Sequence, residues 1–183
     1  MLWLWVLIGI IALILLMFFL YYNRFVVLSN RIKNSLSQIN VQLKRRTDLI
    51  PNLIKTVKGY AKHEKTIMES VNDARKALVG AKGIEAKVRA DGLLESALGK
   101  LFAIAENYPD LKANTNFIEL QKELSTTEDR IAYARQFYND SILSYNNMVQ
   151  QMPGNFFAKI YNRKEKEYLK IAEAEKKNVK VEF

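Results

Sequence analysis

An uninterrupted apolar run over residues 1–20 constrains this chain more than any other feature of its sequence. The run contains no charged residue and is built from Leu, Ile, Trp, Phe, Val, Met and Ala with a single Gly. At about 1.5 Å per residue, a helix of this length spans about 30 Å, the thickness of the hydrocarbon core of a bilayer. Two tryptophans near its start, and Tyr21 and Tyr22 after its end, lie where aromatic side chains gather at membrane–water interfaces. We therefore predict a transmembrane anchor over residues 1–22.

A cleaved signal peptide is the competing interpretation of the same run. A signal peptide has a basic segment before a shorter apolar stretch and a small-residue cleavage site after it. Here no Lys or Arg precedes the run, and the residues after it, YYNRFVVLSN, contain no Ala-x-Ala pattern. The sequence has no Cys, which also excludes a lipid-modified cysteine as anchor. The residues favour a retained anchor.

The charges that flank the anchor predict its orientation. Only the α-amino group lies on the N-terminal side, whereas Arg24, Arg31 and Lys33 follow closely on the other. Positive flanks stay in the cytoplasm. We therefore expect a single-pass protein of the cell membrane with its N-terminus outside and its helical domain in the cytoplasm.

The rest of the chain is strongly basic. All 28 Lys and Arg and all 19 Asp and Glu follow residue 20, so this part carries the whole formal charge of +9. A basic surface attracts anionic lipid headgroups or nucleic acid, and beside a membrane the lipid surface is the nearer partner. A merely solvated basic surface is equally compatible with this composition. Nucleic acid is the least favoured partner, and we expect none.

A heptad-like pattern predicts that the first long segment after the anchor is helical. From residue 32 to residue 78 the positions alternate between steps of four and three, and only Arg46 and Glu64 break the apolar rule. The positions are Ile32, Leu36, Ile39, Leu43, Arg46, Ile50, Leu53, Val57, Tyr60, Glu64, Ile67, Val71, Ala74 and Leu78. The phase passes through Pro51 without a slip, which predicts one helix bent at Pro51 and running to Gly80. Whether this helix continues the transmembrane helix stays open.

Two further helices are expected before the tail. One extends from about residue 84 to 107, and the next begins with Asn116 and Glu119 in a capping-box-like pair and stops at residues 152–154, Met-Pro-Gly. The predicted fold is all-α: an elongated antiparallel bundle of three long helices, the first kinked at Pro51 to give four helical segments, on an N-terminal transmembrane helix. The predicted domains are the anchor 1–22, the bundle 23–154 and a charged C-terminal tail 155–183, partly helical, with a charged segment from 163 to 177.

The residues that catalysis or metal binding requires are scarce. One His and no Cys exclude most nucleophile–base pairs and nearly all transition-metal sites. His63 and Glu64 resemble the start of a zinc-protease motif, but Ile67 stands where its second His belongs. We therefore expect no enzyme activity, no catalytic or metal-binding residue and no cofactor.

A candidate interaction surface comes from polar and aromatic residues in three places. A short basic run includes Lys44 and Arg45, and the next residue, Arg46, is expected to pair with a carboxylate across the bundle. The other candidates lie at the turn after the second helix and on the third helix. The full set is Lys44, Arg45, Asp110, Tyr138, Asn139, Tyr145 and Asn146. For the tyrosines, packing in the core is the competing interpretation, and for Asp110 it is the need of a tight turn.

Three blocks of sequence resemble the bacterial LemA family. They are residues 42–64 (QLKRRTDLIPNLIKTVKGYAKHE), 106–124 (ENYPDLKANTNFIELQKEL) and 128–153 (EDRIAYARQFYNDSILSYNNMVQQMP). The chain departs from the family pattern at 34–35 and at Asn40, and a Lys/Glu-rich tail replaces the family's usual Gly-Phe-rich ending. The resemblance implies a helical bundle on a membrane anchor with an outside N-terminus. It implies no established activity, and family relatives among magnetosome proteins suggest membrane-associated organising roles.

These observations lead to a hypothesis of function. The chain is interpreted as a non-enzymatic, membrane-anchored scaffold or adaptor that engages a partner protein or the anionic membrane surface. The alternatives are a regulator of a membrane protease or sensor kinase and, further down, an enzyme with a carboxylate-only site or a nucleic-acid binder. Self-association through the heptads is an additional expectation. Partner identity, process and oligomeric state do not follow from the sequence.

Overall fold

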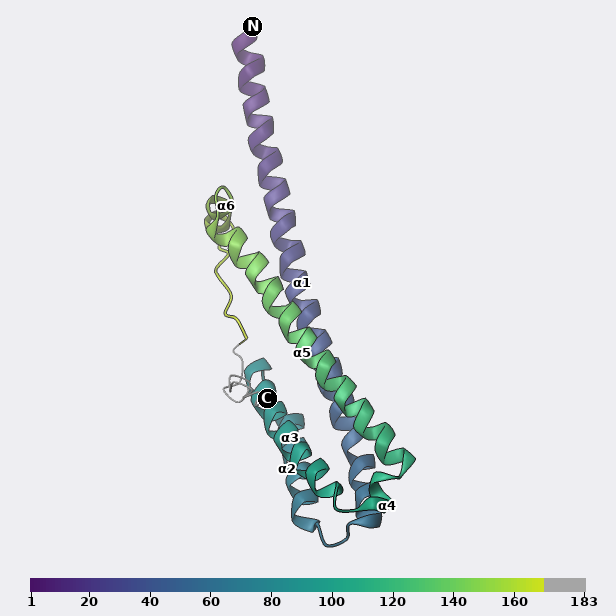
Figure 1. Ribbon diagram of the computed structural model, residues 1–183. Helices are drawn as coiled ribbons and strands as arrows, with labels where there is room; N and C mark the ends of the chain where they lie inside the picture. The colour runs from purple at the N-terminus through teal and green to yellow at the C-terminus, as the bar shows by residue number, and fades with distance from the viewer. Residues whose placement is uncertain (170–183) are drawn as a thin grey trace, which may run out of the picture. The chain divides into compact units, whose positions relative to one another are not determined.

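The computed structural model describes residues 1–169, and the described part is helical without a strand. The helices follow in the order α1 (Leu2–Tyr60), α2 (Lys65–Gly80), α3 (Ile84–Ala105), α4 (Pro109–Lys112), α5 (Thr115–Gln150) and α6 (Gly154–Ile160) (Figure 1). The predicted all-α class is confirmed. The predicted tail helix is wrong for residues 163–169, which form no helix, and the remainder of that segment from residue 170 lies outside the described residues.

The described chain divides into two compact units. The first unit contains residues 1–37 and 136–168, and the second unit contains residues 38–135 and, of the described residues, Leu169 as well. The first unit therefore combines two segments that are far apart in sequence, whereas the second is mainly one continuous run of helices. Each unit is described by itself. The domain boundaries predicted at residues 22 and 154 stay predictions.

Helix α1 is continuous from Leu2 to Tyr60, so the helix after the apolar run continues the predicted transmembrane helix, a point that the sequence left open. The apolar run and the first heptad segment belong to one helix. Within the described residues, α1 is the one helix long and apolar enough to cross a membrane, and no residue of its most apolar window is buried by protein. The large side chains of residues 1–16 are exposed, as lipid-facing side chains would be.

An aromatic core holds the first unit together. Phe25, Ile32, Ile142, Tyr145, Phe157 and Ala158 form its buried cluster. The Phe25 and Tyr145 rings meet edge to face at 5.9 Å between centroids, and the Tyr21 and Phe157 rings stack at 4.5 Å. Because residue 25 meets residue 145 and Ser35 meets Ser141 at 3.3 Å, α1 and α5 are antiparallel here.

Helix α6 closes the core of the first unit against α1. The Tyr161 hydroxyl, just after α6, donates to the Phe18 carbonyl at 2.7 Å. The turn between α5 and α6 passes so close to the Met148 carbonyl that a Cβ on Gly154 would collide with it. A glycine is therefore required at this position. Phe157 and Tyr161 thus pack on the turns of α1 where the apolar run ends.

The second unit corrects the expectation of one bent helix from residue 32 to Gly80. Helix α1 continues through Pro51, and the chain reverses at residues 61–64 before α2 begins. The reversal is shown by the Arg75 side chain of α2, which reaches back to Thr47 of α1. A four-residue turn replaces about one helical turn of 3.6 residues, so the apolar phase carries across the break and hides it.

The heptad positions of α1 are largely confirmed as the buried face. Ile39, Leu43, Ile50, Leu53 and Val57 are all almost fully buried. There are two exceptions: Leu36 is half-buried, with Ser35 buried beside it, and the Tyr60 side chain at the end of the series is exposed. Beyond the turn, Met68 is buried in place of the predicted Ile67, because α2 starts a new helix.

Three more turns complete the second unit. Helices α2 and α3 pack side by side, and α4 leads from α3 to α5 (Figure 1). The start of α5 differs from the prediction: Asn114, not Asn116, accepts the backbone N–H of Phe117 at 3.0 Å. This Asn caps the helix two residues earlier than expected. Arg45 meets Glu123 and Tyr60 meets Asn114, so α5 is antiparallel to α1 in this unit as well.

Candidate interaction surface

The predicted basic pair Lys44 and Arg45 lies on the surface of the second unit. The Lys44 ammonium and Asp48 form an ion pair at 2.8 Å, one helical turn apart, with side chains that are 75% and 56% exposed. The Arg45 guanidinium reaches Glu123 of α5 at 2.6 Å, and both side chains are 46% exposed. Such exposed pairs contribute little to stability, about 0–1 kcal/mol each. Their charges are therefore accessible to another molecule.

Lys44 lines a hollow of about 340 Å³ in the second unit. Its wall combines three cationic side chains with a single carboxylate, and exposed Val79 adds an apolar edge. The lining residues are Asn40, Leu43, Lys44, Thr47, Asp48, Arg75, Leu78, Val79 and Lys87. The Lys87 ammonium donates to the Asn40 amide oxygen at 2.6 Å. We call this site the basic hollow.

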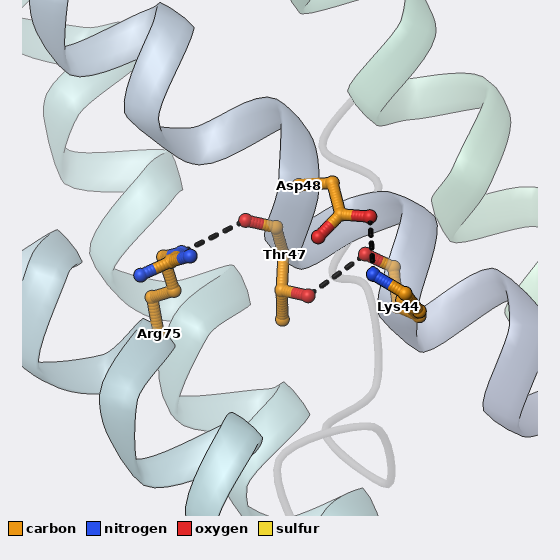
Figure 2. Close-up of polar contacts among 4 residues, drawn as sticks. All are labelled: Lys44, Thr47, Asp48 and Arg75. Atoms are coloured by element: carbon orange, nitrogen blue, oxygen red, sulfur yellow. Dashed lines mark hydrogen bonds and ion pairs between the residues drawn. The ribbon is translucent and has the colours of Figure 1, made fainter.

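Arg75 is a residue that sequence reasoning missed, and it explains how α1 passes through Pro51. Proline has no N–H, so the carbonyl four residues earlier, that of Thr47, loses its helical donor. Arg75 Nε donates to this carbonyl at 2.9 Å from the neighbouring helix (Figure 2). The Thr47 hydroxyl in turn donates to the Lys44 carbonyl at 2.8 Å (Figure 2). The signal in the sequence was Pro51 itself, because a proline inside a helix leaves the carbonyl four residues earlier in need of a donor from elsewhere.

Arg46 is buried and paired, as the sequence predicted. Its side chain is 2% exposed and contacts the Asp91 carboxylate of α3 at 3.0 Å and the Glu128 carboxylate of α5 at 3.6 Å. Asp91 is almost equally buried, whereas the Glu128 side chain is half exposed. One guanidinium therefore ties three helices together inside the second unit, and the Arg46–Asp91 pair serves the fold and not the surface.

The environments of these carboxyl groups raise their pKa values. Burial raises the pKa of Asp91 above its ordinary value of 3.8, and Arg46 opposes that rise. Burial likewise raises the pKa of Glu128, the neighbouring Glu95 adds to the rise, and Arg46 opposes it. The Arg46 charge thus opposes the effect of burial on the pKa of both carboxyl groups.

The predicted aromatic part of the surface needs correction. Tyr145 and Asn146 are 3% and 4% exposed, so they belong to the interior of the first unit. The Asn146 side chain makes two hydrogen bonds with the backbone of Lys166, at 2.9 Å and 2.8 Å. Tyr138 is half-buried against the same core, and burial raises the pKa of both tyrosines. The helix pattern could not separate these residues from surface ones, because Asn and Tyr occur in both places.

Asp110 is exposed in the first turn of α4, next to buried Leu111. The turn around it is held by Tyr108, whose hydroxyl donates to Glu64 at 2.9 Å. This hydrogen bond raises the pKa of Tyr108. The exposed members of the predicted surface are therefore Lys44 and Arg45 on α1 and Asp110 on α4, all in the second unit.

The described residues provide no group of three or more His, Cys, Asp and Glu side chains placed to hold a metal ion. His63, the histidine that the zinc-motif comparison singled out, lies exposed in the turn between α1 and α2. The geometry of the surface is that of charged side chains on helices, suited to binding a macromolecule or a charged segment.

Comparison with known proteins agrees with the resemblance seen in the sequence. Magnetosome protein MamQ 1 of Paramagnetospirillum magneticum is 30% identical, and Magnetosome protein MamQ of Magnetospirillum gryphiswaldense is 31% identical. Both matches cover 80% of this chain and 64% of the relative. Protein LemA of Metamycoplasma hominis is 27% identical over 66% of this chain and 55% of its own length. The chain thus spans somewhat less than two-thirds of the length of these relatives.

A family model extends this agreement over most of the chain. The model described as the LemA family matches residues 35–183. This stretch contains all three blocks that carried the resemblance, so the predicted family is confirmed. The chain belongs to the LemA family.

Proposed function

We propose that this protein is a non-enzymatic, membrane-anchored scaffold or adaptor that engages a partner protein through the basic hollow of the second unit. The observation that carries the proposal is the continuity of α1. The helix that contains the apolar run also supplies Lys44, Thr47 and Asp48 to the basic hollow. The interaction residues are thereby tethered by one helix to a segment suited to a bilayer.

The chemistry of the basic hollow indicates what the partner presents. Three cationic side chains face one carboxylate, so the hollow favours an acidic segment. The hydrogen bonds of Arg75 and Lys87 to Thr47 and Asn40 hold these cations in place before a partner arrives. Preorganisation of this kind reduces the entropy lost on binding. Family membership and the magnetosome relatives support a membrane-associated role.

In-cell photocrosslinking tests the proposal. A photoreactive residue at Lys44 should give a discrete product with another protein, and the same residue at Tyr133, exposed on α5, serves as the control position. Reversing charge in the hollow with Lys44→Glu and Lys87→Glu should remove a product that is captured from Asp110 or Arg45. The matched control, Lys100→Glu with Lys122→Glu, changes the net charge equally at exposed positions elsewhere and should leave the product.

Two results would contradict the proposal. Products formed only with other copies of this chain would indicate a self-associating protein. A heteromeric product that survives charge reversal in the hollow would place the partner at another surface.

A further inference from the structure

The first unit contains a groove on the turns of α1 that follow the apolar run. Its volume is about 980 Å³. The lining residues are Leu20, Tyr21, Asn23, Arg24, Val27, Leu28, Arg31, Ser144, Asn147, Met148, Gln151, Met152 and Gly154. Among the described residues, the lining contains two arginines and no acidic side chain. A volume of this size is enough for a headgroup and part of an acyl chain.

The residues that the structure describes do not neutralise the charge of the groove. Within residues 1–169, neither Arg24 nor Arg31 forms an ion pair. The Arg31 guanidinium lies 4.9 Å from the centre of the Phe137 ring, a cation–π contact that orients the group and leaves its N–H donors for another ligand. Planar guanidinium groups bind phosphate oxygens with two parallel hydrogen bonds, so the groove suits a phosphate.

The place of the groove relative to the apolar run selects the source of that phosphate. Leu20, the last residue of the run, is itself part of the lining. Arg24 follows four residues later, about 6 Å along the helix, which is the depth of the headgroup layer. Arg31 follows about 10 Å further, where its guanidinium lies over the Phe137 ring of α5. The Arg24 guanidinium is thus within reach of a lipid phosphate, and Arg31 adds positive charge at the deeper end of the groove.

The remaining lining separates into apolar and polar parts, as a lipid does. Leu20, Val27, Met148 and Met152 offer apolar surface, and Met152 is 85% exposed. Asn23, Ser144 and Asn147 offer neutral hydrogen-bonding groups beside the arginines. Unbranched Met side chains adapt to irregular apolar ligands.

We propose that this groove is a binding site for one anionic glycerophospholipid, with its phosphate on Arg24, its headgroup directed toward the Arg31 charge, and an acyl chain against Leu20, Met148 and Met152. The inference rests on the membrane anchoring in the proposed function but not on its protein partner. It names a lipid site in the first unit, whereas the basic hollow belongs to the second.

The test uses the full-length chain in nanodiscs made from zwitterionic phosphatidylcholine with a small fraction of phosphatidylglycerol that carries a photoreactive acyl chain. Crosslinks should map to peptides that contain residues 20–31 or 144–154. Arg24→Gln with Arg31→Gln should reduce this labelling about twenty-five-fold, from about fivefold for each basic residue near an anionic surface. The control Arg89→Gln with Arg130→Gln removes two exposed arginines of the second unit and should not change it.

The single variant Arg24→Gln controls for a folding defect in the double variant. Arg24 is exposed and the Arg31–Phe137 contact is kept, so the single variant should fold normally. It should reduce the labelling about fivefold. Equal labelling by a photoreactive phosphatidylcholine, or labelling unchanged in the arginine variants, would overturn the lipid site. A further comparison is made in detergent, where inorganic phosphate and phosphatidylglycerol each compete with the photoreactive lipid for labelling. Equally effective competition by inorganic phosphate would overturn the lipid as the source of the anion. Failure of the chain to enter nanodiscs would overturn the membrane anchoring as well, and so distinguishes the two proposals.

Discussion

Replacing Arg46 with methionine is expected to lower the free energy of unfolding by about 3–5 kcal/mol, because it leaves the Asp91 carboxylate buried without its cation. The exposed neighbour gives the matched control. Arg45→Met removes an ion pair whose side chains are 46% exposed and should change stability by less than about 1 kcal/mol. Urea denaturation of the full-length chain in mild detergent, followed by circular dichroism, measures both.

The pH dependence of the Arg46→Met variant provides a second measurement of the same effect. A raised pKa in the folded state means that folded Asp91 holds its proton more tightly than unfolded Asp91 does. Stability contributed by such a group falls as the pH rises from its ordinary pKa through the raised one. Loss of Arg46 raises the pKa of Asp91 further, so the deficit of the variant should be largest at neutral pH and shrink toward pH 4.

A double variant distinguishes two causes of the lost stability: the loss of the Arg46 charge beside Asp91, and the loss of the packing of the Arg46 side chain. Arg46→Met with Asp91→Leu replaces the buried pair with apolar groups and should recover most of the lost stability. A double variant as unstable as Arg46→Met alone, or a deficit independent of pH, would show that packing and not the charge of Asp91 determines the loss.

The second large effect is expected at Arg75. Arg75→Met removes the donor to the Thr47 carbonyl that Pro51 leaves without a helical partner, and should lower the free energy of unfolding by about 1.5–3 kcal/mol. In a Pro51→Ala background the residue 51 N–H can reach that carbonyl, so the same replacement should have a smaller effect. The four proteins form a double-mutant cycle with an expected coupling of about 1–2 kcal/mol.

One outcome of the double-mutant cycle would contradict this explanation. If Arg75→Met lowers stability equally with proline and with alanine at position 51, the Arg75–Thr47 hydrogen bond does not compensate for the proline. Arg89→Met, an exposed arginine on α3, is the control for loss of charge and should have little effect in either background.

The sequence predicted what periodicity and pairing rules determine. The apolar run, the helical class, the buried face of α1 and the carboxylate partner of Arg46 all followed from spacing and from the desolvation of charge. The reversal at residues 61–64 did not follow, because a turn of four residues preserves the helical phase. The same limit explains Met68, which replaces Ile67 in the core once α2 starts afresh.

The candidate site was predicted less completely than the fold. Lys44, Arg45 and Asp110 are exposed as expected, but Tyr145 and Asn146 are buried in the first unit. Tyr and Asn side chains occur both in the interior and on the surface, so their type does not predict their burial. The Asn146 side chain is buried because it hydrogen-bonds the Lys166 backbone, a partner that no pattern in α5 indicates. Arg75 was missed because its role depends on the proline of another helix. The arginines at 24 and 31 were assigned only to orientation, since their shared groove requires the α5 residues beside them.

The proposed function depends most directly on α1 anchoring the chain in a membrane, and the charges that flank the apolar run predict that the helical units lie in the cytoplasm. Because the sequence has no Cys, a single introduced cysteine is the sole thiol in the protein. We would make Leu2→Cys and Asp110→Cys separately and treat intact spheroplasts with a membrane-impermeant maleimide. Labelling of residue 2 before permeabilisation, and of residue 110 only after it, is the predicted result. Labelling of residue 110 in intact spheroplasts would place the basic hollow outside the cell and contradict the account.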